Sequence, residues 1–216
     1  MERSSRDLIS GYIAAAAALI LFGWLARDVL QHQTIRFDAA VRDGMHLLAS
    51  PGLTKLFGTI TWLGSELFLI PFGALVVWRL AAAGRRQAAV LLVLAAAGGE
   101  LLDQILKLAF HRGRPASFFG YPLPDSYSFP SGHAMISACF FGVLAAVLTA
   151  RMESRGLRVS IWTAAALLAL LIGMSRIYLG VHYPSDVAAG YCAAILWVAA
   201  VRAGYLVWLR RRTGQA

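Results

Sequence analysis

Six long apolar segments limit what this chain can fold into more than any other feature of its sequence. They span residues 10–30, 56–80, 87–110, 131–150, 159–178 and 185–209, and each approaches the roughly 20 residues with which a helix crosses a bilayer. Only 14% of the 216 residues are charged, whereas a soluble domain averages roughly 25%. The sequence therefore predicts an all-α integral membrane bundle of six transmembrane helices, forming one domain over residues 1–216.

The first apolar segment has an alternative interpretation as a cleaved signal peptide. Arg3 and Arg6 precede it, as basic residues precede the apolar region of such a peptide. The apolar run is long for that purpose, however, and Arg27 and Asp28 follow it without a clear cleavage site. An uncleaved first helix is the favoured interpretation.

The arginines predict the orientation of the helices. Four basic groups lie before the first segment, between the second and third, between the fourth and fifth, and after the sixth. With six spans, all four groups fall on one side, which the positive-inside rule assigns to the cytoplasm together with both termini. In the last segment, Arg202 lies about 27 Å from Pro184 and is expected to snorkel to the cytoplasmic interface. The chain is thus expected to be a multi-pass protein of the cell (inner) membrane.

The connections 31–55, 111–130 and 180–184 are expected on the opposite, periplasmic or extracellular side. The first mixes apolar and charged residues in an order that predicts a short amphipathic helix on the membrane surface. The net charge of +9 can mark nucleic-acid binding, but here the basic residues lie between apolar runs and not on a soluble face. The expected partners are the bilayer and a lipid substrate, with no nucleic acid and no obligate protein partner.

Three polar stretches, 107–115, 128–133 and 175–186, fall at the non-cytoplasmic ends of these segments. Ionisable residues at the edge of an apolar segment are costly and mark function by default. In the second stretch, Ser131 suits an N-cap, and the free N–H groups of the helix that follows can bind an anion. Gly132 would let that anion approach the backbone closely.

Four cations gather at this face of the membrane: Lys107, Arg112, Arg114 and Arg176. Asp103 lies one turn before Lys107 and can pair with it, but the arginines remain short of carboxylate partners. Because arginine binds phosphate through two parallel hydrogen bonds, a phosphate group is the natural missing anion.

Two histidines beside a phosphate site would allow a two-step transfer. His182 would attack phosphorus, and Asp186 would orient it and stabilise the imidazolium. His133 would protonate the leaving oxygen and then activate water. No cluster has the spacing of metal ligands, so neither a metal nor another cofactor is expected.

These stretches resemble the three signatures of the type-2 phosphatidic acid phosphatase superfamily, K-x6-RP, PSGH and SR-x5-H-x3-D. The resemblance is carried by Lys107 with Arg114 and Pro115, by residues 130–133, and by Ser175 and Arg176 with His182 and Asp186. One departure is Gly113, where many relatives have proline, and it leaves that loop looser.

The resemblance implies a metal-independent phosphatase for membrane lipid phosphates or diphosphates, acting through a phosphohistidine. Its catalytic residues would be His182, His133 and Asp186. Its phosphate-binding residues would be Lys107, Arg114, Ser131, Gly132 and Arg176. The layout is similar to bacterial members that act on phosphatidylglycerophosphate, undecaprenyl pyrophosphate or phosphatidate.

Two alternatives stay open on the sequence alone. A lipid phosphotransferase would use the same site with a lipid acceptor in place of water. A catalytically silent lipid-binding or transport protein would retain the membrane segments, although transporters place ionisable residues near the midplane. The placement of both histidines at helix ends on one side favours hydrolysis.

Overall fold

The computed structural model describes residues 2–212 and 214, with side chains from residue 9 onward. The described residues form eight helices and no strand, which confirms the predicted all-α class. The helices are α1 (Glu2–Leu30), α2 (Ile35–Leu47), α3 (Pro51–Trp62), α4 (Glu66–Ala82), α5 (Arg86–Phe110), α6 (Gly132–Thr149), α7 (Arg155–Tyr178) and α8 (Pro184–Arg212). Residues 1, 213, 215 and 216 of the predicted domain, and the side chains of Arg3 and Arg6, lie outside this description.

Five of these helices, α1, α5, α6, α7 and α8, are long and apolar enough to cross a membrane, and α3 with α4 adds a sixth if the bent pair counts as one span. The prediction of one unbroken helix over 56–80 is wrong, because α3 and α4 meet at 44°. Ser65 has an extended backbone at the break, and a Cβ on Gly64 would overlap the side chain of Ile172. Glu66 begins α4 at this break and is exposed.

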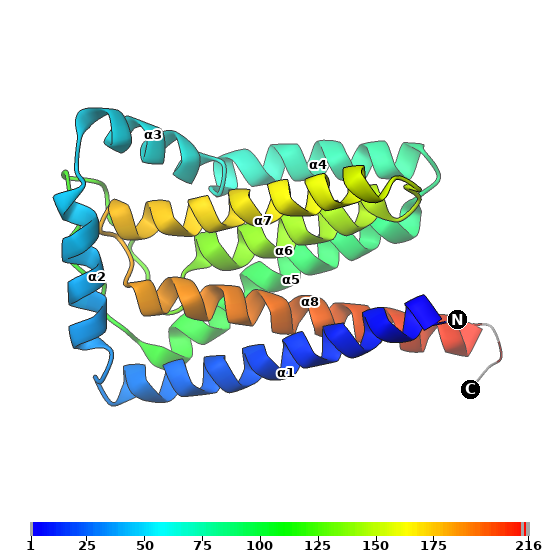
Figure 1. The fold of residues 1–216 in the computed structure, drawn as a ribbon, viewed down its shortest axis with the longest axis horizontal. Coiled ribbons are helices and arrows are strands. Elements are labelled where there is room, and N and C mark those ends of the chain that lie inside the picture. Colours follow the sequence, from blue (N-terminus) through cyan, green and yellow to red (C-terminus); the bar gives the residue numbers. More distant parts are fainter. Residues whose placement is uncertain (1, 213, 215–216) are drawn as a thin grey trace.

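The long helices run side by side, and α2 crosses one end of the bundle (Figure 1). The loop 111–131 and the α7–α8 connection lie at this end, which we call the α2 end, and the chain termini lie at the other. Helix α6 is central, since 61% of its most apolar window is buried, against 28% or less in the other four single spans. The first turn of α6 is therefore surrounded by the other helices where the polar stretches emerge.

Helix α2 confirms the amphipathic helix expected within 31–55, but one face of it is anchored to protein. Phe37 and Leu47 are exposed, whereas Asp38 is fully buried. Val41 and Met45, which share the face of Asp38, pack against α6, α7 and α8. Helix α2 therefore covers the ends of α6, α7 and α8, and it buries the Asp38 carboxylate between itself and these helices.

Close contact between α6 and α8 depends on Gly190. A Cβ at this position would lie 2.7 Å from the Ser131 backbone oxygen and 3.2 Å from the Ala134 Cβ. Small residues allow such an approach between membrane helices. The Ser131 N–H donates to the Asp186 backbone oxygen at 3.0 Å, so the two helix starts are fixed to each other.

We expect Gly190→Ala to lower the free energy of unfolding by about 1–3 kcal/mol, because the added methyl must displace backbone. Thermal unfolding in detergent measures this. The matched control is Gly204→Ala in the same helix, where no atom lies within 4 Å of the new Cβ. An equal loss in both variants would contradict the packing argument.

Candidate active site

The three polar stretches meet at the α2 end of the bundle. Lys107 lies in the last turn of α5, His133 in the first turn of α6, and Arg176 in the last turn of α7. His182 lies in the α7–α8 connection and is only 2% exposed. The structure thus brings together residues separated by up to 75 positions in the sequence.

The two ring nitrogens of His182 face different partners. Nδ1 lies 3.4 Å from the Asp186 Oδ2, and the Ser128 hydroxyl donates to that same oxygen. Nε2 lies 3.0 Å from the Arg114 Nη1. With its proton on Nδ1, the ring directs a lone pair on Nε2 toward the guanidinium, which donates to it. The arrangement fits an imidazole that is oriented from one side and reacts from the other.

Burial lowers the pKa of the His182 imidazole well below its ordinary value, and the charges of Arg114, Arg176 and Lys107 lower it further. Burial also lowers the pKa of the Arg114 guanidinium, although Asp186 and Asp103 oppose that shift. The site therefore favours a neutral His182 surrounded by cations.

Arg112 is held between two fully buried carboxylates, so the expectation that the arginines lack carboxylate partners is wrong for this residue. Its guanidinium lies 2.7 Å from Asp38 and 2.5 Å from Asp186. Asp38 also accepts hydrogen bonds from the Ser185 N–H at 2.9 Å and the Ser185 hydroxyl at 2.7 Å, at the start of α8. Sequence reasoning missed Asp38, although its place on the Val41 face of α2 was a usable signal.

Arg114 is also more fully bonded than expected, but by backbone and not by carboxylates. It donates to the carbonyls of Ser126 at 2.7 Å and Val181 at 3.1 Å. These bonds tie the loop after α5 to the α7–α8 connection. They also hold the guanidinium over the Nε2 of His182.

The predicted Asp103–Lys107 pair forms, with Nζ and Oδ2 2.6 Å apart and both side chains buried. Glu100 does not extend it and accepts instead from Gln104 at 2.7 Å. A Cβ on Gly132 would lie 2.9 Å from the Asp103 Oδ2 and 3.2 Å from the Lys107 Nζ. This glycine therefore lets the start of α6 approach the ion pair.

Three buried polar atoms around the site have no hydrogen-bond partner among the described residues: Asp103 Oδ1, Ser131 Oγ and Arg176 Nε. Ser131 is the N-cap residue of α6, as expected, but its hydroxyl makes no capping hydrogen bond to the backbone of the helix. The other end of the Arg176 guanidinium donates to Thr61 on α3 at 2.7 Å. Because a buried group without a partner costs free energy, these atoms suit a polar ligand.

The charges of the site also suit an anion. Four cations, Lys107, Arg112, Arg114 and Arg176, face three carboxylates, Asp38, Asp103 and Asp186. His133 lies among these groups, close enough for Arg176, His182 and Lys107 to act electrostatically on its ring. Within residues 2–212 and 214, no group of three His, Cys, Asp or Glu is arranged to hold a metal ion.

Two contributions to the site had no clear signal in the sequence. Thr61 comes from α3, 115 positions before Arg176. Ser128 lies at the edge of its stretch and bonds to Asp186 from a loop. Phe129, in the same loop, is fully buried against Phe22 and Phe110.

Comparisons with known proteins agree with this arrangement. The family model described as the PAP2 superfamily matches residues 88–210. The chain is 31% identical over 160 residues to phosphatidylglycerophosphatase B of Bacillus subtilis, covering 74% of this chain and 78% of that protein. It is 32% identical over 174 residues to lipid A 1-phosphatase of Rhizobium etli, covering 71% of each.

A solved structure gives the same result for the fold. The crystal structure of a transmembrane PAP2 type phosphatidylglycerolphosphate phosphatase from Bacillus subtilis matches with a TM-score of 0.82 and 28% identity, over 89% of this chain and 96% of that one. The chain therefore belongs to the PAP2 superfamily, as its signatures indicated. The curated relatives are named as lipid phosphatases, which confirms the expectation of an enzyme of this class.

We expect Asp38→Asn to lower the free energy of unfolding by about 3 kcal/mol, because it leaves the buried charge of Arg112 only partly compensated. Thermal unfolding in detergent measures the loss. Asp43→Asn is the control, since Asp43 is exposed on the same helix. A stability equal to the wild type would show that the buried pair contributes little.

Proposed function

We propose that this chain hydrolyses the phosphate of a membrane lipid phosphate or diphosphate through a phosphohistidine at His182. Phosphatidylglycerophosphate, undecaprenyl pyrophosphate and phosphatidate are the candidate substrates. The observation that carries the proposal is the set of buried polar atoms without hydrogen-bond partners, contributed by the same elements as the three signatures, at the end of the bundle that holds both histidines. The chemistry draws on these side chains alone and uses no metal or cofactor.

The phosphate would be bound by the hydrogen-bond donors and cations of this site. Arg176 Nε and Ser131 Oγ would donate to its oxygens, and Lys107 and Arg114 would add positive charge. The first N–H groups of α6, at Gly132, would also donate to the anion. Together these donors would stabilise the charge on the equatorial oxygens in the transition state.

In the first step, Nε2 of His182 would attack phosphorus. The Arg114 hydrogen bond would pass from Nε2 to a phosphate oxygen, which frees the lone pair. The bond from phosphorus to the lipid oxygen would break, and His133 would donate a proton to that oxygen. Asp186, through Nδ1, would stabilise the positive charge on the phosphorylated ring.

In the second step, His133 would take a proton from water. The hydroxyl oxygen would bond to phosphorus as the bond to Nε2 breaks. Inorganic phosphate would leave, and His182 would return to its neutral form with its proton still on Nδ1. His133 would carry the proton needed for the next cycle.

The proposed topology places this site on the outer face of the cell membrane. The α3–α4 pair would serve as the sixth span, with both termini in the cytoplasm and residues 1–216 acting as one domain. At the end opposite α2, Arg85 and Arg151 lie in the connections and Arg155 begins α7, as the positive-inside rule requires of a cytoplasmic side. The lipid tails would stay in the bilayer while the phosphate enters from its surface.

The first prediction from this mechanism is that His182→Ala abolishes phosphate release while the protein still folds. His46→Ala is the control, since that imidazole is exposed and stacks on Phe118 outside the site. Release of free phosphate from a ³²P-labelled lipid monophosphate in detergent is the measurement. Activity within twofold of wild type in His182→Ala would refute the nucleophile, and label on a second lipid would indicate transfer in place of hydrolysis.

The same assay separates the two histidines. With an aryl phosphate ester, whose leaving group needs no acid, His133→Ala should still phosphorylate His182 but should hydrolyse the intermediate slowly. Acid-labile protein-bound ³²P is therefore expected to accumulate in His133→Ala and to be absent from the double variant with His182→Ala. Label that survives without His182 would place the covalent bond elsewhere.

The second prediction concerns pH. Because the attacking His182 must be neutral and its pKa is lowered below 6.5, the acid limb of kcat/KM should lie below pH 6.5. Removing a nearby cation favours the protonated ring, so Arg114→Gln should move that limb to higher pH as well as reduce activity. Arg36→Gln, at an exposed position on α2, is the control. Because every variant is assayed with the same substrate, the ionisation of the substrate phosphate affects all pH profiles equally and does not contribute to the difference between them. A limb that does not move in Arg114→Gln would contradict the assignment.

A further inference from the structure

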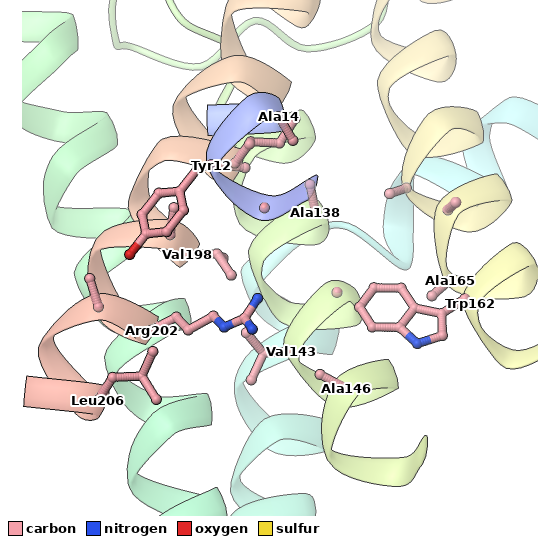
Figure 2. Close-up of a pocket in the computed structure, with 18 residues that line it drawn as sticks. Tyr12, Ala14, Ala138, Val143, Ala146, Trp162, Ala165, Val198, Arg202 and Leu206 are labelled. Carbon is pink, nitrogen blue, oxygen red and sulfur yellow. The ribbon is translucent and has the colours of Figure 1, made fainter. Parts of the chain in front are cut away.

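A cavity lies in the half of the bundle near the chain termini, far from the proposed phosphate site. It has a volume of about 590 Å³ and opens between α1, α6, α7 and α8 (Figure 2). Along α8 it extends from Ala194 to Leu206, which is about 18 Å at the rise of an α-helix. Its walls are almost entirely apolar, and small residues such as Gly142 and Ala199 leave the space open.

One cation lies in this apolar groove. Arg202 reaches from α8 toward α6, and Trp162 on α7 points toward it from the other side (Figure 2). The side chain crosses the groove here. Among the residues that the structure describes, the Arg202 guanidinium has no hydrogen-bond or ion-pair partner.

The position of Arg202 matches the level of a lipid head group. It lies eighteen residues after Pro184 at the start of α8, or about 27 Å along the helix, which approaches the roughly 30 Å thickness of the hydrocarbon core. Trp162 lies seven residues into α7, and tryptophan favours the interfacial level of a bilayer. From Arg202 the groove continues toward the middle of the membrane, past Ala194 and Ala138.

We propose that this groove binds an anionic phospholipid, with its phosphate on Arg202 and one acyl chain between α1, α6, α7 and α8. A guanidinium binds a phosphate through two parallel hydrogen bonds, and basic pockets between membrane helices bind lipid head groups. The apolar walls match an acyl chain. The lipid would come from the leaflet on the side of the chain termini, and the groove shares no residue with the phosphate site.

A helix from a second copy suits this groove less well than a lipid does. A helix is at least about 10 Å across with its side chains, whereas an acyl chain is a single narrow hydrocarbon. A second copy would also have to bring a carboxylate to Arg202. A narrow chain with an anionic head satisfies both the shape and the charge.

The test is native mass spectrometry of the full chain in a mild detergent, after delipidation and titration with dioleoyl phosphatidylglycerol. Dioleoyl phosphatidylcholine tests the charge, and inorganic phosphate tests the need for the acyl chain. Arg202→Gln removes the cation, and Arg158→Gln removes a charge from an exposed site on the same side of the protein. Gly142→Leu fills the groove, and no atom lies within 4 Å of its new Cβ, so the fold should accept it.

We expect the wild type to retain one phosphatidylglycerol in preference to phosphatidylcholine and to bind no inorganic phosphate in the groove. Arg202→Gln should weaken retention of phosphatidylglycerol about tenfold, as the loss of one charge-assisted contact predicts, and should remove the preference. Gly142→Leu should weaken both lipids, and Arg158→Gln neither.

Three results would overturn the proposal. The first is equal retention by all variants. The second is an equal loss in Arg158→Gln and Arg202→Gln, which would indicate only a surface charge effect. The third is a two-chain species without lipid that Gly142→Leu separates, which would assign the groove to a second copy.

Discussion

The candidate site depends on Arg112 lying between two buried carboxylates. Asp38 and Asp186 are both fully buried, and neither could stay ionised there without a partner. Arg112 pairs with both and so ties α2 to the start of α8. Because the backbone of Asp186 also accepts from Ser131, the position of α6 follows from the same interaction. Two of the three signature stretches are therefore held in place by one guanidinium.

This interaction also reconciles two opposing electrostatic requirements. A phosphate site needs an excess of positive charge, yet an attacking imidazole must be neutral. The carboxylate of Asp186, 3.4 Å from Nδ1 of His182, would by itself favour the protonated ring. Arg112 partly neutralises Asp186, while Arg114, Arg176 and Lys107 lower the pKa of His182. The cations that would bind substrate thus also keep the imidazole neutral before the substrate arrives.

The sequence predicts what depends on local pattern and misses what depends on distant contacts. Hydropathy locates the long helices, and motif spacing brings Lys107, His133 and His182 to one end. The break after α3 is not visible in the apolar run over 56–80, because it depends on how closely Gly64 approaches Ile172 on α7. The arginines seemed unpaired because the Arg112 partner, Asp38, lies 74 positions away.

Packing differs between the two ends of the bundle, and the difference follows from what each end holds. At the α2 end, Gly190 and Gly132 let helices approach within contact of backbone and charged groups, which fixes the geometry that electrostatic catalysis requires. Toward the termini, α8 is flanked by two open apolar grooves. The groove that holds Arg202 is lined mostly by alanine and glycine. Arg202 lies sixteen residues from Asp186, about 24 Å along the same helix. Lipid bound in such a groove would complete the packing of α8 without entering the reactive end, because the two ends share no side chain.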